Sequence, residues 1–284
     1  MDDVTFTYIV DGVMWMDAHR FFPSIPPQYW RDHPDALDAS GRVVMSTGGL
    51  LVERDGHRLL IDAGLGTDIT QTSYGPCDCG HFLKTLRGVG LSATDIDVFA
   101  LTHLHPDHTG WAWHSAQPGN RVLTFARAPY VIAEAEWAPL AGGVRPPGIA
   151  DADALVELIG NHRLLTLIAD GEEVAPGVAT IVTPGHSAGH TSYVITSRAR
   201  RRLIAFGDVF HIPAQLRHPE WGSAPDADRA AVAAARARIV DELCQPETIG
   251  FGLHFGDQPF GRIVPPGLRW QPVATTMLSV SSPR

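Results

Sequence analysis

The chain has 284 residues, of which 44% are hydrophobic and 19% charged, as in a globular protein with a sizeable core. Its formal net charge of −9 argues against a nucleic-acid partner, because phosphates bind to basic surfaces. The sequence contains neither a long apolar run nor a basic segment followed by an apolar one, so we expect no membrane span and no secretory signal. Three cysteines, an odd number, favour reduced thiols, and together these features predict a cytoplasmic protein.

The first half of the chain contains four segments with the pattern of regular structure. They are a strand at residues 5–10, a hairpin formed by 43–53 and 57–62, a short helix at 81–88 and a strand at 97–102. Between the first two of these, residues from about 13 to 40 are rich in aromatic residues and proline. We predict that this segment is an irregular excursion rather than a helix.

The second half continues the alternation of apolar strands with turns. Strands are predicted at residues 178–183, 191–196, 202–206 and 248–254, and a long helix at 226–244. Apolar strands that end in polar residues favour a mixed α/β fold with helices outside two packed sheets. No linker-like change of composition divides the chain, so we predict one domain covering residues 1–284.

The most informative segment is His103-Leu-His105-Pro-Asp107-His108, which directly follows an apolar strand. Residues two apart in an extended chain face the same way, so His103 and His105 project together. Pro106 then forces a turn, which brings Asp107 and His108 round to the same place. Three imidazoles and a carboxylate exceed what one tetrahedral ion with an open position needs, so the segment predicts two metal ions.

Three more polar residues, His186, Asp208 and His254, follow predicted strands later in the chain. Each is weak evidence by itself, because a lone histidine or aspartate at a strand end is more often structural. The alternative that the first cluster is only core packing is unfavourable, since ionisable groups rarely fill a core.

The ordered set of motifs resembles the metallo-β-lactamase superfamily, from the strand end at Asp62 to His254. The resemblance implies a four-layer αββα sandwich with its site along the sheet edges. It also implies two divalent metal ions, expected to be Zn²⁺, with Mn²⁺, Fe²⁺ and Co²⁺ as alternatives. The implied ligands are His103, His105 and His186 for one ion and Asp107, His108 and His254 for the other, with Asp208 bridging both. Asp62 would support a ligand loop, and His190 matches a position that is usually not a ligand.

The implied reaction is hydrolysis of an ester-like bond by a metal-bridging hydroxide. The leaving group would take a proton from Asp107 or Asp208 through metal-bound water. His211 would donate a hydrogen bond to the substrate, although a purely structural loop histidine is the alternative.

The stretch from Gly207 to Trp221 resembles the branch that contains methyl parathion hydrolase and N-acyl-homoserine lactonases. Lactonases usually carry a tyrosine where this chain has His211, and many relatives have a Pro-Phe-Pro-like run where it has residues 255–260. Both departures concern the pocket rather than the metal ligands, so they bear on the substrate and not on the chemistry. We expect a small apolar lactone or carboxylic ester, with a phosphotriester and then a β-lactam or thioester as alternatives.

Functions outside this class fit less well. A diiron redox enzyme of this fold would have an acidic residue at the position of His105, and a nuclease would need basic extensions. A metal-binding partner protein without activity stays an alternative. We further expect a homodimer through the excursion, and an apolar substrate cleft lined by aromatic residues. The candidates for this lining are Trp15, Phe21, Phe22, Trp30, Trp111, Trp113 and Phe260.

Overall fold

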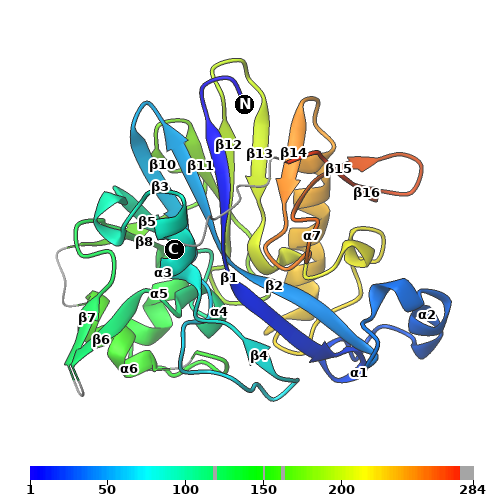
Figure 1. The fold of residues 1–284 in the computed structure, drawn as a ribbon. Helices are drawn as coiled ribbons and strands as arrows, with labels where there is room; N and C mark the ends of the chain where they lie inside the picture. Colours follow the sequence, from blue (N-terminus) through cyan, green and yellow to red (C-terminus); the bar gives the residue numbers. More distant parts are fainter. Residues whose placement is uncertain (118–119, 150, 161–163, 276–284) are drawn as a thin grey trace, which may run out of the picture.

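A computed structural model describes residues 1–117, 120–149, 151–160 and 164–275 of the chain. In these residues two seven-stranded sheets pack against each other, and helices cover their outer faces (Figure 1). The predicted αββα sandwich is therefore confirmed. No helix in the described ranges has the length and apolar character needed to cross a bilayer.

The first sheet has the strand order β4-β1-β2-β3-β5-β8-β9, and a separate small hairpin, β6–β7, lies beside it. Its strands are β1 (Thr5–Asp17), β2 (Arg42–Arg54), β3 (His57–Ile61), β4 (Cys77–Asp78), β5 (Val98–Ala100), β8 (Tyr130–Ala133) and β9 (Leu165–Ile168). The hairpin and the helices on this side are β6 (Trp113–Gln117), β7 (Asn120–Leu123), α3 (Phe82–Gly88), α4 (Pro106–Thr109), α5 (Glu134–Ala141) and α6 (Ala152–Leu155).

The second sheet has the order β10-β11-β12-β13-β14-β15-β16 and is covered by the long helix α7 (Arg229–Leu243). Its strands are β10 (Glu173–Ala175), β11 (Val178–Val182), β12 (Thr191–Thr196), β13 (Arg202–Ala205), β14 (Thr248–Phe251), β15 (Phe260–Val264) and β16 (Arg269–Pro272). The β13–β14 pair is parallel, and its neighbouring pairs are antiparallel.

Alternating side chains of the strands build separate apolar layers. In β13, Leu203 and Ala205 belong to the cluster between the sheets, whereas Ile204 packs in the cluster under α7 with Ile239. In β3, Leu60 packs toward α3 while its neighbours face the second sheet. The period of two places apolar residues on both faces of each sheet, as expected for sheets buried on both sides.

The predicted excursion is wrong in part, because β1 continues through it to Asp17. Its register with β2 pairs Met14 with Met45 and Asp17 with Arg42, after a bulge between Val10 and Gly12. The chain then forms two short helices, α1 (Ala18–Phe21) and α2 (Pro27–Asp32). Pro27 occupies the first turn of α2, where a proline costs no hydrogen bond.

The aromatic rings of this segment are buried within the chain itself. Phe22 is fully buried, and Phe21 and Trp30 are about as enclosed, at 6% and 4% exposure. These three rings are therefore covered, whereas Trp15 and Tyr29 are partly exposed, and the homodimer stays a prediction. The three cysteines are free, which agrees with the predicted reduced thiols.

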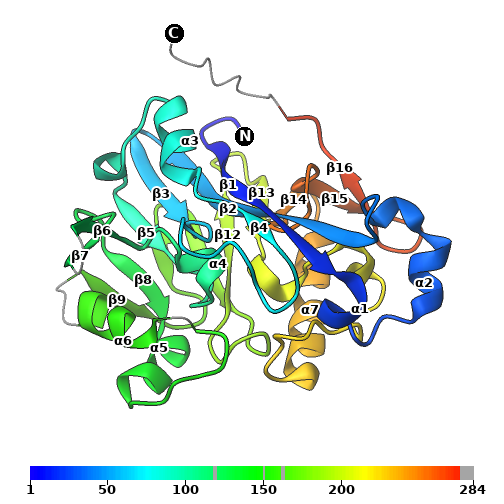
Figure 2. The same ribbon diagram turned by 60° about the horizontal axis from the view of Figure 1, so that its bottom comes forward.

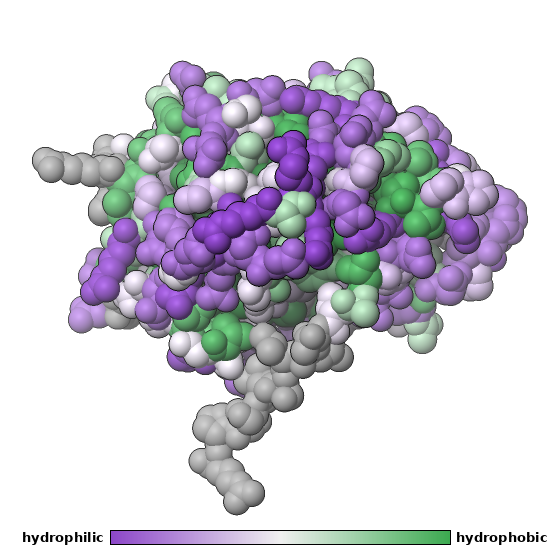
Figure 3. All heavy atoms as spheres, turned by 90° about the horizontal axis from the view of Figure 1, so that it is seen from above, coloured by the Kyte–Doolittle hydropathy of each residue, from purple (hydrophilic) through white to green (hydrophobic). Residues whose placement is uncertain are grey.

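One end of the sandwich is hydrophilic and carries ion pairs, and the carboxyl ends of β3 and β5 lie at the other. At the upper end in Figure 1, Arg198 between β12 and β13 forms ion pairs with Asp55 of the β2–β3 turn and with Asp3. The view from above shows mostly hydrophilic residues at this end (Figure 3). The carboxyl ends of β3 and β5 lie at the opposite end, which faces forward in Figure 2.

Candidate metal centre

The predicted ligands come from loops that leave both sheets at one edge of the sandwich. His103, His105, Asp107 and His108 follow β5, and Pro106 begins the short helix α4. His186 follows β11, Asp208 lies in the turn after β13, and His254 follows β14. The structure thus brings together all seven residues from four separate segments.

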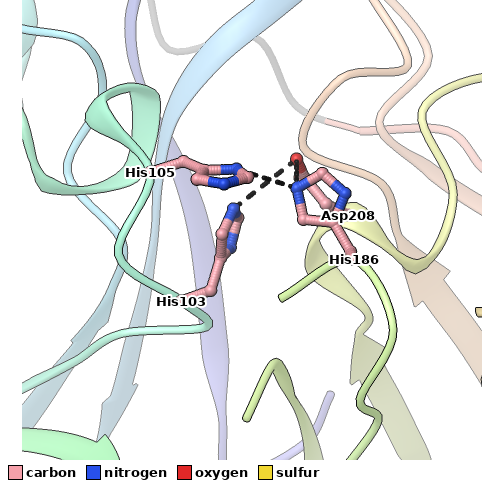
Figure 4. A group of neighbouring side chains, drawn as sticks. All are labelled: His103, His105, His186 and Asp208. Atoms are coloured by element: carbon pink, nitrogen blue, oxygen red, sulfur yellow. Dashed lines mark hydrogen bonds and ion pairs between the residues drawn. The ribbon is translucent and has the colours of Figure 1, made fainter. Parts of the chain in front are cut away.

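These side chains form two groups that share Asp208. In each group, one ligand atom per residue lies within 4.8 Å of all the others. We call His103, His105, His186 and Asp208 the first metal group (Figure 4), and Asp107, His108, Asp208 and His254 the second metal group.

The carboxylate of Asp208 presents one oxygen to each group. Its Oδ2 lies 3.1 Å from His186 Nε2 and 3.8 Å from His103 Nε2. Its Oδ1 lies 3.2 Å from His108 Nε2 and 3.1 Å from His254 Nε2. A carboxylate in this position can bridge two cations, one on each oxygen.

Several of these side-chain atoms make no hydrogen bond with the residues that the structure describes. Within the described residues, Nε2 of His103, His108 and His254 and Oδ1 of Asp208 are buried and lack a hydrogen-bond partner. Such groups are costly to bury unless something binds them. Neutral imidazole nitrogens and carboxylate oxygens are the donors that Zn²⁺ and similar divalent ions prefer, so the residues present fit two such ions.

Hydrogen bonds on the far sides of three rings determine which nitrogen is free to bind. His108 Nδ1 donates to Asp62 Oδ2 at 2.9 Å, and His254 Nδ1 donates to the carbonyl of Ser46 at 2.8 Å. His186 Nδ1 donates to Asp226 Oδ1 at 2.9 Å. Nδ1 therefore carries a proton in each ring, and Nε2 is the nitrogen left to bind a cation once it has lost any proton of its own.

Asp62 holds the start of the ligand loop as well as His108. Its two oxygens accept hydrogen bonds from the backbone N–H and the hydroxyl of Thr102 at 2.8 and 2.9 Å. Because the Thr102 hydroxyl donates to Asp62, its oxygen accepts from His103 Nδ1 at 3.0 Å. The supporting position predicted for Asp62 is therefore the one it occupies.

The ionisation of the histidines is uneven. Burial and the neighbouring His186 lower the pKa of His105 to about 3, and burial with the adjacent His108 holds the pKa of His103 well below its usual range. Burial alone would lower the pKa of His186, but the carboxylates of Asp208 and Asp226 raise it to about 9. His103 and His105 are thus ready to bind a cation, whereas His186 must lose a proton first.

His190 is buried at the centre but directs neither ring nitrogen toward the two groups. Its Nε2 accepts the backbone N–H of Asp208 at 2.9 Å, so its Nδ1 donates to the Thr183 hydroxyl at 2.8 Å. This agrees with the expectation that His190 is not a ligand.

His211 lies beside the first metal group, with its Nε2 3.1 Å from Asp208 Oδ2. Its ring is parallel to that of His254 and meets the edges of Phe21 and Phe22 at centroid distances of 5.3 and 6.2 Å. Those two phenylalanines pack against His211 and are themselves buried, so the aromatic lining of a substrate cleft stays a prediction. Trp111, Trp113 and Phe260 instead pack against the apolar layers of the two sheets.

Sequence reasoning did not identify three charged residues behind the ligands. Asp226 receives the hydrogen bond of His186 and lies 3.6 Å from the guanidinium of Arg236, which is fully buried in α7. Glu136 accepts hydrogen bonds from two ligand loops. Asp226 precedes a helix, and Arg236 and Glu136 lie within helices, where charged residues are ordinarily solvated; no local pattern distinguishes them.

The fold and the site define the metallo-β-lactamase class of hydrolases. The model of the metallo-β-lactamase superfamily matches residues 45–243, more than half of the chain, and the chain belongs to that superfamily.

Sequence relatives fall in the predicted lactonase branch. Over 115 residues the chain is 30% identical to N-acyl homoserine lactonase AiiA of Bacillus thuringiensis subsp. kurstaki and 34% identical to a Bacillus cereus N-acyl homoserine lactonase. Each match spans 40% of the chain and only 39% of the lactonase. The anti-Pycsar protein Apyc1 of Saccharibacillus brassicae is 25% identical over 177 residues, 60% of the chain and 61% of that protein.

Solved structures share the whole fold. The hydrolase AbOPH of the β-lactamase superfamily superposes with a TM-score of 0.81 at 22% identity, covering 98% of this chain and 97% of that one. The dizinc quorum-quenching lactonase AidC has a TM-score of 0.76 at 23% identity, with 96% of both chains covered. A probable metal-dependent hydrolase from Staphylococcus aureus has a TM-score of 0.77 at 22% identity, covering 97% and 99%.

Proposed function

We propose that the protein is a dinuclear metal-dependent hydrolase of an ester-like bond, with a lactone or carboxylic ester as substrate. The observation that carries this proposal is the position of Asp208, whose two oxygens face different groups of imidazole nitrogens. Two divalent cations, with Zn²⁺ as the proposed metal, supply a water of lowered pKa as nucleophile and Lewis acidity toward the carbonyl oxygen.

The residues of the chain position these cations and leave one side of the centre open. Side-chain exposure is 0–3% for His103, His108, His186, His254 and Asp208, but 19% for Asp107. A substrate would therefore approach from the side of Asp107. The backbone carbonyl of Asp107 accepts the Thr47 hydroxyl at 3.0 Å, which holds this residue at the opening.

Two residues are placed to handle protons at the reacting bond. The partly exposed carboxylate of Asp107 lies 3.5 Å from His254 Nε2 and can carry a proton toward a leaving alkoxide at the opening. Asp208 would act indirectly, by holding the cations that supply the nucleophilic water. His211 stands on the side of the first metal group and is proposed to donate a hydrogen bond to the substrate oxygen.

The substrate class follows from the relatives and from the walls of the site. The relatives named above as N-acyl homoserine lactonases support a lactone. Phe21 and Phe22 pack against His211 and, although buried, make its surroundings apolar, which favours a substrate with an acyl group.

The experiment pairs metal content with hydrolysis for the wild type and Asp208→Asn. Purified protein is analysed for bound metal and then tested on a lactone, an aryl ester, a phosphotriester, a β-lactam and a thioester. We expect close to two metals per chain in the wild type and turnover of the lactone or ester. The variant loses the oxygen charge that both groups share, so we expect weaker binding of both metals and a loss of kcat/KM of at least about 100-fold.

Asp257→Asn is the matched control, because Asp257 is exposed and lies only three residues after His254. It should keep both metals and full activity. A wild-type protein that holds two metals and hydrolyses none of the substrates would contradict the proposed reaction. Turnover of only the phosphotriester would contradict the proposed substrate.

A further inference from the structure

Glu136 is a buried carboxylate that accepts three hydrogen bonds, none from a cation. It lies in α5 and is 3% exposed. Its Oε1 accepts the backbone N–H of Leu104 at 3.1 Å. Its Oε2 accepts the hydroxyl of Ser187 at 2.7 Å and the backbone N–H of Gly189 at 2.8 Å. Both oxygens are therefore used by donors that belong to loops rather than to the helix.

These donors lie in the two loops that carry the histidines of the first metal group. Leu104 stands between His103 and His105, in the loop after β5 of the first sheet. Ser187 directly follows His186, in the loop after β11 of the second sheet. One side chain thus connects the ligand loops of two different sheets, next to all three imidazoles of one metal group.

The backbone of the second loop also rests directly on α5. A Cβ added to Gly189 would lie 2.1 Å from the backbone nitrogen of Glu136, closer than any real contact, so only glycine fits there. The second metal group is supported differently, by Asp62 behind His108 and by the carbonyl of Ser46 behind His254. Asp62 also reaches His103 of the first group through the Thr102 hydroxyl, whereas the hydrogen bonds of Glu136 go only to the two loops of the first group.

We propose that Glu136 is a positioning residue that sets the spacing of the first metal group and thereby its affinity for a cation, with a much smaller effect on the second group. This inference rests on the metal centre proposed above but not on its substrate. Partners behind metal ligands commonly change metal affinity about 10- to 100-fold when they are removed.

The test is Glu136→Gln, which keeps the size of the side chain. An amide has only one acceptor oxygen, so its NH₂ group must face either the N–H of Leu104 or that of Gly189. One of the two loops is then released. We expect the affinity of one cation to fall about 10- to 100-fold and the other to stay within about twofold of the wild type.

Cadmium serves as the probe, because its nuclear magnetic resonance signal depends on its ligands. The first group offers three imidazole nitrogens and one carboxylate, and the second offers two of each. Titration of the metal-free protein with Cd²⁺ should give two signals in the wild type. In Glu136→Gln the signal of the nitrogen-rich site should require more cadmium to appear.

Glu134→Gln is the matched control, since Glu134 lies on the same helix and is exposed. It should titrate like the wild type. Ser187→Ala removes one hydrogen bond to Glu136 without changing the carboxylate, and we expect a smaller loss at the same site. This second variant keeps the test decisive if Glu136→Gln does not fold.

Unchanged affinity at both sites in the two variants would overturn the proposal. Equal weakening of both sites would also overturn it, since a general loss of stability would act on both. A wild type that binds two cadmium ions but is inactive with zinc on every substrate would contradict the proposed reaction. It would not affect the test of Glu136, which depends only on the cadmium signals.

Discussion

His211 differs from the histidines that direct a hydrogen bond away from the site. Among the residues that the structure describes, neither of its ring nitrogens has a hydrogen-bond partner, although its side chain is buried. Its backbone is held by Gln215, whose Oε1 accepts the His211 N–H at 2.7 Å. Its Nε2 faces Asp208 Oδ2 at 3.1 Å without a hydrogen bond of good geometry. A buried ring of this kind, on a backbone that is held in place, is suited to contact a substrate.

His211→Phe tests this role. Phenylalanine can keep the contacts with Phe21, Phe22 and His254 but offers no nitrogen. We expect kcat to fall at least about 100-fold while two metals stay bound. Steady-state kinetics together with metal analysis measure this. Unchanged kcat would show that the ring only fills space, and loss of a metal would show that it is a ligand.

At the scale of elements, Asp11 connects loops that would otherwise separate from the first sheet. Its carboxylate accepts the backbone N–H groups of Leu65, Gly66, Gly80 and Phe82 and the indole N–H of Trp111, at 2.8–3.1 Å. These donors belong to the loop after β3, the start of α3 and the segment after α4. A bulge in β1 between Val10 and Gly12 places Asp11 where it can reach them.

Asp11→Ala should therefore destabilise the whole domain. Three buried and two partly buried N–H groups would lose their acceptor, and we expect the free energy of unfolding to fall by at least about 3 kcal/mol. Denaturant unfolding of the metal-free protein measures the effect. Asp68→Ala, at an exposed position of the same loop region, should change it by less than about 0.5 kcal/mol. A loss below about 1 kcal/mol in Asp11→Ala would contradict the assigned role.

At the scale of the whole molecule, the candidate metal centre draws its residues from both halves of the sandwich. The first sheet supplies His103, His105, Asp107 and His108, and the second supplies His186, Asp208 and His254. At the opposite end, Arg198 and Asp55 connect turns of the two sheets through an exposed ion pair, which contributes little to stability. Bound cations would thus connect the two sheets at the edge that carries the candidate site.

Removal of the metals with a chelator should lower the unfolding temperature, and added Zn²⁺ should restore it. A ligand that binds only the folded state stabilises it by about 2.7 kcal/mol at a hundred times its Kd. Scanning calorimetry with and without chelator measures the shift. Asp208→Asn should respond much less. If neither chelator nor Zn²⁺ changed the unfolding temperature of the wild type, a cation that bridges the two sheets would be contradicted.

Much of the fold could be predicted because local patterns were clear. Asp55-Gly56 between apolar runs predicted the β2–β3 hairpin, and β12 has the predicted bounds 191–196. Other elements lacked such signals. β8 is four fully buried apolar residues without alternation, and Pro139 lies within α5, so neither had a readable pattern.

Two predicted strands end earlier than their apolar pattern does. Residues 97–102 form β5 only as far as Ala100, because Thr102 donates its N–H to Asp62 instead of to a neighbouring strand. The strand predicted to reach His254 likewise ends at Phe251. In both places the backbone leaves the sheet to present ligands, and sheet pairing competes with the site for the same residues.

The sequence by itself determined the kinds of ligand and their order, since the two-residue period and Pro106 bring His103, His105, Asp107 and His108 together locally. Only the tertiary structure decided what supports them. The hydrogen bond of Glu136 to Leu104 spans 32 residues, and that of His186 to Asp226 spans 40. Such contacts depend on how helices pack on sheets, and no local pattern of residues predicts that packing. A charged residue that is buried in a helix cannot be distinguished by sequence from one that is solvated.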